Sequence, residues 1–441
     1  MVDEWIEVPV SYLAAESQNA LATGPFGSAI SSKYFQAHGV PVIRGGNLTT
    51  TIDQRLVEEG LAFLSPEKAL EFSRSVVRCG DLVFTCWGTI GQVGLIDNRG
   101  QYDEYVISNK QMKLTPDARK ADSLFLYYVF SSPPVSDDIK SQSIGSSVPG
   151  FNLGQLKSIR LRLPPLGTQR AIADVLGVLD DKIEQNRRTA LALERLARAI
   201  FRAWFADFEP VKAKAAGATA FPAMPQPVFD ALPTRFVDSD IGLLPEGWGV
   251  KALNEVVQLT MGQSPKSKFY NLNGEGLPFH QGVSDHGFRF PTRRVYCTVE
   301  VRIAEAGDIL LSVRAPVGRI NVADVKMVLG RGLAGMRHFS GRQSFLLYQM
   351  QYLFAEDDAI GDGTIYKSVN KEYLHAMPLL TAPRDVEEAF ERIARPMDKL
   401  ISSVVLESRK LAEMRDYLLP KLLGGEARVG DVRYVAGEVA Q

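Results

Sequence analysis

The sequence predicts an α+β protein: two globular, mixed α/β halves separated by two long helices. Three observations predict it. One heptad pattern lies near the middle of the chain, a second lies near its end, and similar short motifs recur in the same order before each. With 441 residues, of which 45% are hydrophobic, the chain is long enough for two or three domains with buried cores.

The first heptad pattern lies at residues 164–208, where good helix formers follow Pro164-Pro165 without another proline. Two sets of positions interleave at alternating steps of four and three residues, as in a coiled-coil seam. They are Ile172, Leu179, Asn186, Leu193 and Ile200, and Leu176, Ile183, Ala190, Ala197 and Trp204. A helix of this length spans roughly 60 Å, too long for the interior of one domain, so we expect a partner helix elsewhere in the chain.

The partner pattern lies near the C-terminus. A shift of 218 positions carries Asp180 to Asp398 and Asn152 to Asn370. The matching seams are Phe390, Met397, Val404, Leu411 and Leu418, and Ala394, Ile401, Ser408, Arg415 and Leu422. A repeat this long is not a solenoid period; it indicates a duplicated half-molecule. The polar Asn186 on the first seam is either a tolerated position or a residue that sets register or orientation.

The remaining elements follow from local patterns. In the first half we expect a short strand and turn at 5–13, a strand at 40–43, a helix opened by Ser65 and Pro66, a hairpin within 76–97, an apolar helix or strand at 123–130, and a Gly/Ser loop from 144 into a strand at 160–163. Residues 207–244 are rich in alanine and proline and lack periodicity, which predicts a loop-like linker.

These patterns give predicted boundaries for the whole chain. They are a globular domain at 1–163, a central long helix at 164–208, a linker at 209–244, a second globular domain at 245–382, a C-terminal long helix at 383–425 and a tail at 426–441.

Several classes of protein and site are not expected. The three cysteines Cys79, Cys86 and Cys297 show no paired spacing, which favours a reducing compartment. The N-terminus lacks the apolar core of a signal peptide, and no run approaches the roughly 20 apolar residues of a membrane span; we expect a cytoplasmic protein without a membrane partner. A phosphate-binding GxxxxGK[ST] loop, the Asn/Asp-Pro-Pro-aromatic motif of amino-methyltransferases and metal-ligand histidine spacing are all missing. The sequence therefore predicts no catalytic centre, metal or bound cofactor.

Particular motifs at both helices resemble the specificity subunit of type I restriction-modification systems. They are residues 163–170 (LPPLGTQR), 178–186 (VLDDKIEQN), 204–208 (WFADF), 244–248 (LPEGW), 262–265 (GQSP), 397–400 (MDKL) and 415–426 (RDYLLPKLLGGE). The resemblance extends over essentially the whole chain. One departure is that TAPRDVE, at 381–387, replaces the Pro-Pro-Leu-x-x-Gln motif before the second helix.

The resemblance implies a non-catalytic subunit with two target-recognition domains, each recognising one half of a bipartite site in double-stranded DNA. The long helices would pair as an antiparallel coiled coil, set the spacing and dock two methyltransferase subunits. Those subunits would hold S-adenosylmethionine and methylate a flipped adenine, and restriction/translocase subunits would join for cleavage. The alternatives are a structural adaptor that never contacts DNA, or a stand-alone DNA methyltransferase or nuclease.

The net charge of −1 does not itself indicate nucleic-acid binding, although basic runs at 109–120 and 314–342 allow it; such runs are also common on solvated surfaces. Arginine suits guanine, and glutamine or asparagine suits adenine, while lysine suits phosphates. The candidate DNA-binding residues, each near a Gly/Pro turn, are Arg44, Asn47, Lys110 and Gln111 in the first half, and Gln263, Lys266, Gln281, Arg314 and Arg331 in the second.

The candidate residues for helix pairing and partner docking lie on the two long helices. They are Leu179, Asn186, Leu193, Ile200, Trp204, Phe205, Met397, Val404, Leu411 and Leu418. For Trp204, Phe205 and Phe208 two interpretations stay open, namely core packing at the end of the helix and docking to a methyltransferase subunit.

Overall fold

The computed structural model describes residues 5–143, 150–354 and 369–430, so the start of the predicted Gly/Ser loop and the end of the tail lie outside the described residues. The chain divides into two compact units. Unit 1 comprises Met1–Arg187 and Glu407–Gln441, and unit 2 comprises Arg188–Leu406. Each of the two long helices therefore contributes one part to unit 1 and another to unit 2.

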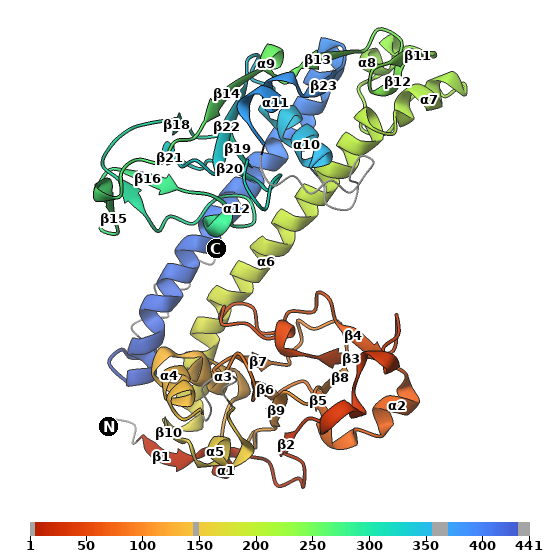
Figure 1. The fold of residues 1–441 in the computed structure, drawn as a ribbon. Helices are drawn as coiled ribbons and strands as arrows, with labels where there is room; N and C mark the ends of the chain where they lie inside the picture. Colours follow the sequence, from red (N-terminus) through yellow and green to blue (C-terminus); the bar gives the residue numbers. More distant parts are fainter. Residues whose placement is uncertain (1–4, 144–149, 355–368, 431–441) are drawn as a thin grey trace. The chain divides into compact units, whose positions relative to one another are not determined.

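Unit 1 contains two four-stranded sheets and a strand pair that joins the ends of its globular part (Figure 1). The pair is β1 (Ile6–Pro9) with β10 (Arg160–Leu163). The first sheet has the order β2 (Leu21–Thr23), β9 (Gln111–Leu114), β6 (Leu82–Thr85), β7 (Val93–Leu95). The second has the order β4 (Ala62–Leu64), β3 (Val40–Ile43), β8 (Glu104–Ile107), β5 (Val76–Arg78).

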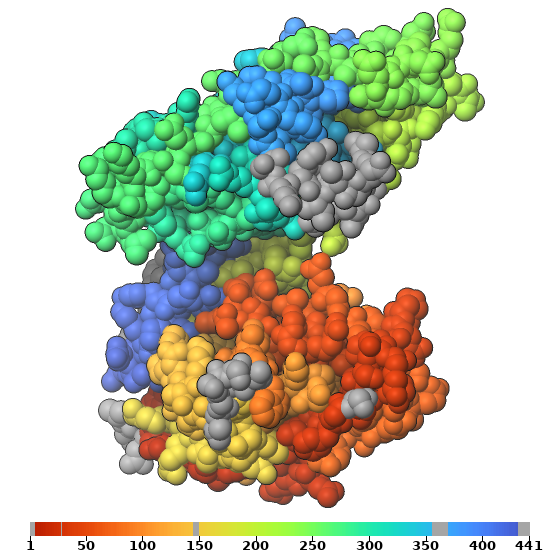
Figure 2. Space-filling view, viewed as in Figure 1, coloured from red at the N-terminus to blue at the C-terminus, as the bar shows by residue number. Residues whose placement is uncertain are grey.

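The short helices of unit 1 are α1 (Val10–Leu13), α2 (Pro66–Leu70), α3 (Ser123–Ser131), α4 (Pro133–Ser141) and α5 (Leu153–Ser158). As predicted, α2 begins after Ser65, whose hydroxyl accepts the Lys68 N–H, with proline at the first position. The predicted hairpin is β6–β7, while β5 belongs to the other sheet. In the space-filling view the red, orange and yellow residues of this unit form one continuous body (Figure 2).

Unit 2 repeats this architecture, with five strands in its second sheet. Its strand pair is β13 (Gly249–Ala252) with β23 (Pro378–Thr381). One sheet has the order β14 (Val257–Met261), β22 (Leu333–His338), β19 (Ile309–Ser312), β20 (Ile320–Val322). The other has the order β15 (Tyr270–Asn271), β17 (Tyr296–Cys297), β16 (Leu277–His280), β21 (Met327–Leu329), β18 (Ile303–Ala304). Its short helices include α9 (Leu253–Val256), α10 (Gln343–Leu353) and α11 (Lys371–Ala376).

Two features confirm the duplication that the sequence predicts. Asn152 and Asn370, which are 218 positions apart, cap α5 and α11, and each side chain accepts the backbone N–H three residues later. In both units a parallel strand pair forms the centre of the second sheet, β3 with β8 and β16 with β21. The remaining single turns are 3-10 helices at Gly27–Ala29, Ser32–Tyr34, Gly45–Asn47, Ser73–Ser75, Ser267–Phe269 and Val283–Asp285.

The long helices are α6 (Leu166–Phe205) and α12 (Arg384–Gly424), and they pack together along the predicted seams. In unit 1 the core contains Leu176, Leu179 and Ile183 of α6 with Leu411 and Leu418 of α12. In unit 2 it contains Ala197, Trp204, Phe390 and Ala394. The seam positions Leu193, Ile200, Met397 and Val404 are half-buried.

An aromatic cluster closes the end of α6 in unit 2. Trp204 and Phe205 are buried against Trp248, Phe345 and Phe390. Phe208 packs edge-to-face on Trp248 with ring centroids 5.6 Å apart. The burial of Trp204 and Phe205, and the packing of Phe208 on Trp248, favour the core-packing interpretation over docking to a partner.

The segment expected to be a loop-like linker was wrongly interpreted. It contains α7 (Glu209–Ala215), α8 (Gln226–Ala231) and the hairpin β11 (Phe236–Ser239) with β12 (Gly242–Pro245). These elements are too short to show a period in sequence, and they form because Val211, Met224, Val228, Phe229 and Leu232 bury their side chains in the core around Trp204. Across the described ranges, none of the helices is long and apolar enough to cross a membrane.

Candidate nucleic-acid interface

Four loops of unit 1 meet where the parallel strands β3 and β8 end. The Ile43 carbonyl accepts the Ser108 N–H at 3.0 Å, the Gly24 N–H donates to the Gln111 carbonyl at 2.9 Å, and the Cys86 N–H donates to the Lys110 carbonyl at 2.8 Å. We call the loops that follow β2, β3, β6 and β8 in this unit (residues 24–27, 44–47, 86–91 and 108–110) the first edge.

Unit 2 repeats the same backbone contacts. The His280 carbonyl accepts the Gly330 N–H at 2.8 Å, the Gly262 N–H donates to the Leu333 carbonyl at 2.9 Å, and the Val313 N–H donates to the Gly332 carbonyl at 2.9 Å. The loops that follow β14, β16, β19 and β21 (residues 262–266, 281–282, 313–318 and 330–332) form the second edge. By this correspondence, the position of Arg44 in unit 1 is equivalent to that of Gln281 in unit 2, Trp87 is equivalent to Arg314, and Asn109 is equivalent to Arg331.

Both edges depend on one close backbone approach. A Cβ on Gly24 would lie 1.8 Å from the Ser108 carbonyl oxygen, and a Cβ on Gly262 would lie 2.1 Å from the Gly330 carbonyl oxygen. Only glycine fits at these two positions. The sequence showed the Gly/Pro turns but not which strand ends they meet.

On the first edge the predicted residues separate into two groups. Arg44 and Lys110 are exposed, and Arg44 Nη2 donates to the Gly60 carbonyl at 2.8 Å, which fixes its guanidinium 5.6 Å from the Phe35 ring. Asn47 is only 3% exposed: its Oδ1 accepts the Arg44 N–H and its Nδ2 donates to the Val57 carbonyl.

Gln111 is also inaccessible. It is 0% exposed, and its Oε1 accepts a hydrogen bond from the Ser108 hydroxyl. Because a base-reading side chain must reach solvent, Asn47 and Gln111 support the loops of the first edge and do not present their amides to DNA. Arg44 and Lys110 remain as candidates there.

The second edge brings four of its five predicted residues together. Gln263, Gln281, Arg314 and Arg331 are all exposed and come from four different loops. The Ser264 hydroxyl donates to Gln281 Oε1 at 2.8 Å and accepts the Arg331 N–H at 3.2 Å. This contact occupies the Gln281 side-chain oxygen and leaves the amide NH2 as the group that can donate to a ligand. Lys266, also exposed, lies farther along the loop that carries Gln263.

Most charges of the two basic runs are neutralised inside the protein. In unit 2, ion pairs join Arg342 to Glu387 at 2.7 Å, Arg337 to Asp308 at 2.6 Å, and Lys326 to Glu300 at 2.6 Å. Within the described part of the chain, no acidic side chain lies within ion-pair distance of Arg314 or Arg331. The positive charge available to a ligand in this run therefore lies at the second edge.

Burial also lowers the pKa of two groups behind the edges. The Lys113 ammonium group is buried, which lowers its pKa, and its Nζ donates to the Val76 carbonyl at 2.7 Å. Burial lowers the pKa of His280, next to Gln281, although the Asp285 carboxylate opposes this. Side chains on the edge surface, and not these buried groups, supply the polar chemistry at each edge.

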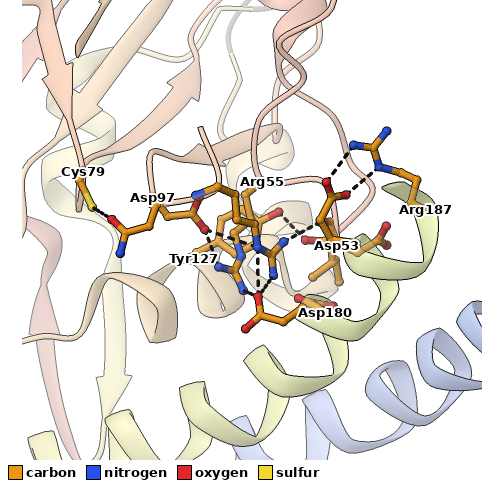
Figure 3. Close-up of polar contacts among 12 residues, drawn as sticks. Asp53, Arg55, Cys79, Asp97, Tyr127, Asp180 and Arg187 are labelled. Carbon is orange, nitrogen blue, oxygen red and sulfur yellow. Dashed lines mark hydrogen bonds and ion pairs between the residues drawn. The ribbon is translucent and has the colours of Figure 1, made fainter. Parts of the chain in front are cut away.

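A buried ionic cluster between the globular part of unit 1 and its long helices was not anticipated (Figure 3). Arg55 Nη1 is 2.5 Å from Asp97 Oδ2. On the helix side, Arg415 Nη1 donates to Asp180 Oδ1 at 2.9 Å, and the Tyr128 hydroxyl donates to Asp180 Oδ2 at 2.6 Å. The cluster joins α3 and α12 to α6.

Unit 2 has a counterpart at the repeated aspartate. The Tyr348 hydroxyl donates to Asp398 Oδ1 at 2.8 Å, and Arg289 Nη2 donates to the same oxygen at 2.9 Å. Arg289 also lies 3.2 Å from Glu194 of α6. The spacing of Asp180 and Asp398 was visible in the sequence, but their tyrosine and arginine partners are distant in sequence and could not be assigned.

Two exposed aromatic residues on the first edge were also missed. The side chains of Phe26 and Trp87 are 85% and 51% exposed, and each lies in a loop next to the Asn109–Lys110 turn. A glycine follows each of them in sequence, which is the only signal that could have marked them as loop residues. A search of the described ranges finds no group of three or more His, Cys, Asp or Glu side chains arranged to hold a metal ion.

Comparison with known proteins finds similar sequences along most of the chain. A model of the type I restriction modification DNA specificity domain matches residues 28–195. The putative type I restriction enzyme MjaX specificity subunit of Methanocaldococcus jannaschii is 26% identical over 401 residues, covering 89% of this chain and 88% of that protein. The type I restriction enzyme HindI specificity subunit of Haemophilus influenzae is 24% identical over 409 residues, covering 80% of this chain and 88% of that protein.

A solved structure has the same fold. The crystal structure of a type I restriction-modification system S subunit from M. genitalium matches with a TM-score of 0.60 at 15% identity, and covers 95% of this chain and 96% of that one. The sequence matches extend along most of the chain, so over most of its length it is similar to specificity subunits of type I restriction-modification systems.

Proposed function

We propose that the chain selects a bipartite site in double-stranded DNA, with the first edge recognising one half-site and the second edge the other. The observation that carries this proposal is that two equivalent loop edges, built by the same backbone hydrogen bonds, present different side chains. A repeated scaffold with two different surfaces suits the recognition of two different sequences.

The exposed side chains suggest how the contacts divide. At the second edge, Arg314 and Arg331 can each donate two hydrogen bonds to a guanine, and the exposed amide of Gln281 suits the edge of an adenine. At the first edge, Arg44 is preorganised by its bond to Gly60 and suits the same kind of contact. Lys110 and Lys266 are suited to phosphates, which position the protein without reading sequence.

The long helices and the partner subunits complete the proposal. The paired helices α6 and α12 would set the number of base pairs between the half-sites. The chain would dock two methyltransferase subunits, which bind S-adenosylmethionine and methylate adenine, and restriction/translocase subunits would join for cleavage. The chain itself would contribute recognition and no catalysis.

A methylome tests this function. The chain is expressed with its methyltransferase subunit in a host without such marks, and modified bases are mapped by sequencing. We expect N6-methyladenine confined to a two-part motif with a fixed gap, and loss of all marks when this chain is omitted. Marks that persist without the chain would contradict a specificity role, and methyl transfer by the purified chain alone would show an enzyme instead. If the complex assembles but binds no DNA at low salt, the chain is an adaptor.

A further inference from the structure

We propose that Phe26 and Trp87 form an aromatic wedge that enters a base step of the first half-site, a specificity contact that the second edge lacks. This inference rests on the proposed function, because it assumes that the first edge meets duplex DNA. It adds the insertion of aromatic rings between bases to the hydrogen bonds proposed above for this edge.

Both aromatic residues are held in place by their own loops. Asn109 Nδ2 donates to the Gly27 carbonyl at 3.2 Å, which ties the loop carrying Phe26 to the strand end at Lys110. Trp87 pairs as an isolated β-bridge with Gly150, and a Cβ on Gly150 would lie 2.7 Å from its ring. One face of the indole is therefore in close contact with the backbone, while about half of the side chain faces solvent.

The neighbouring side chains favour DNA as the ligand. Phe26 and Trp87 lie in loops hydrogen-bonded to the turn that carries the exposed Lys110, and Arg44 follows the strand next to this turn. Cations beside exposed rings suit a ligand that offers phosphates and a stack of bases together. A purely apolar protein surface would leave these cations without partners.

The second edge shows that the aromatic pair is not required by the fold. The position corresponding to Trp87 is Arg314, and Ser264 occupies the position two residues after the shared glycine, as Phe26 does. The same scaffold carries hydrogen-bonding groups in one unit and apolar rings in the other. The two half-sites would therefore be recognised by different physical effects.

A wedge confers specificity through the cost of unstacking. Opening a base step costs a few kcal/mol, and pyrimidine–purine steps open most easily. We therefore expect the first half-site to contain such a step at the wedge. Because aromatic rings displace no counterions, removal of the wedge should weaken binding without changing its salt dependence.

The experiment uses the chain assembled with its methyltransferase subunit and duplexes that carry the methylome-derived target. The fluorescent base 2-aminopurine, which brightens on unstacking, replaces in turn each purine of the first half-site except the methylated adenine. The variants are Phe26→Ser and Trp87→Ala. The control is Leu70→Ala, because Leu70 is an apolar residue of α2 that is 77% exposed and lies away from the first edge. The strand before α2 ends at Leu64, which pairs with Val40 at the start of β3, whereas Arg44 follows the end of β3.

We expect a several-fold rise in fluorescence at one step with the native chain and with Leu70→Ala, and its loss in both wedge variants. The wedge variants should bind the target about tenfold more weakly with an unchanged salt slope, whereas Lys110→Gln should reduce that slope by about one. Second half-site preference and the unfolding midpoint should stay unchanged, which separates these effects from misfolding.

Two results would overturn the wedge alone. One is a bipartite methylation motif with no brightened step, or with a step that stays bright in both variants. The other is loss of the methyltransferase subunit from the wedge variants with DNA binding intact, which would make the aromatic pair a protein-docking site. If the native complex yields no bipartite motif at all, the proposed function fails first, so the two failures are distinguishable.

Discussion

Arg415 Nη1 donates to Asp180 Oδ1 at 2.9 Å, and this contact joins α12 to α6 inside unit 1. Both side chains are buried, and Arg415 occupies a seam position that would otherwise hold an apolar residue. Burial raises the pKa of Asp180, while Arg415 and Tyr128 act in the opposite direction by donating to the carboxylate. The helix pair therefore depends on an ionic contact whose loss leaves a buried charge.

Arg415→Met should destabilise unit 1 by about 3–5 kcal/mol, because it leaves Asp180 buried without its cation. Adding Asp180→Leu should recover much of that loss, since two apolar groups replace the pair. Denaturant unfolding of the full chain measures both. Lys410→Met, at an exposed position on the same helix, is the control and should change stability by less than about 0.5 kcal/mol. Equal effects of the Arg415 and Lys410 substitutions would contradict the account.

Arg289 should behave in the same way in unit 2. Its guanidinium is buried between Asp398 of α12 and Glu194 of α6, so Arg289→Met leaves two carboxylates without their shared cation. We expect a loss of about 3–5 kcal/mol, measured by the same unfolding experiment. Arg235→Met is the control, because Arg235 and Glu246 form an exposed ion pair worth about 0–1 kcal/mol. A loss of stability no larger than that of the control would show that Arg289 does not stabilise the contact between α6 and α12.

The stability of unit 2 should depend on pH through His338. Burial lowers the pKa of His338 from 6.5 to about 4, and its Nδ1 accepts the Ser340 N–H at 3.0 Å, which requires a neutral ring. The unfolded chain therefore binds the proton first on acidification. The free energy of unfolding should fall by about 1–3 kcal/mol between pH 6.5 and pH 4, with the full contribution present above pH 6.5.

The His338→Asn variant isolates this contribution. Its unfolding midpoint should change less than that of the native chain between pH 7.5 and pH 4.5, although other groups titrate in both proteins. The exposed His38 provides the control, and His38→Asn should leave the native pH dependence intact. If His338→Asn keeps the full native pH dependence, the buried imidazole is not the titrating group.

Asn186 tests the polar contact between the paired helices. Its Nδ2 donates to Glu407 Oε2 at 2.7 Å, so Asn186→Asp would place two carboxylates together in a mostly buried position. We expect a loss of about 1–3 kcal/mol at pH 7, recovered when Glu407→Gln is added. Thermal unfolding of the two variants measures this. No recovery in the double variant would show that Asn186 is merely a tolerated polar position.

The long helices were predictable because their signal is local. Steps of three and four residues define a helical face within a few turns, so Leu176, Leu179 and Ile183 could be assigned to a seam without any knowledge of the rest of the chain. The duplication was visible for the same reason, since Asn152 and Asn370 each begin a helix with a capping pattern contained in four residues.

The candidate interface was predictable only in part. Chemistry and turn signals selected Arg44, Gln281 and Arg331 correctly as exposed edge residues, but they also selected Asn47 and Gln111, which are buried. The burial of an amide depends on parallel strand pairings such as β3 with β8, which join residues more than 60 positions apart. No local pattern encodes such a pairing, so the convergence of the loops, and the exposure of Phe26 and Trp87, required the structure.

Paired variants test whether the two edges recognise separate half-sites. Methylomes are recorded for the complex carrying Arg44→Ala with Lys110→Ala, and for the complex carrying Gln281→Ala with Arg331→Ala. The control is Lys326→Ala, which removes a basic residue at the opposite end of β21 from Arg331.

We predict that the first pair relaxes or abolishes base preference in one half of the methylation motif, that the second pair does so only in the other half, and that the control leaves both halves intact. Each lost base contact should reduce discrimination by about 1–3 kcal/mol. A motif unchanged in both paired variants, or altered in both halves by either pair, would contradict the account.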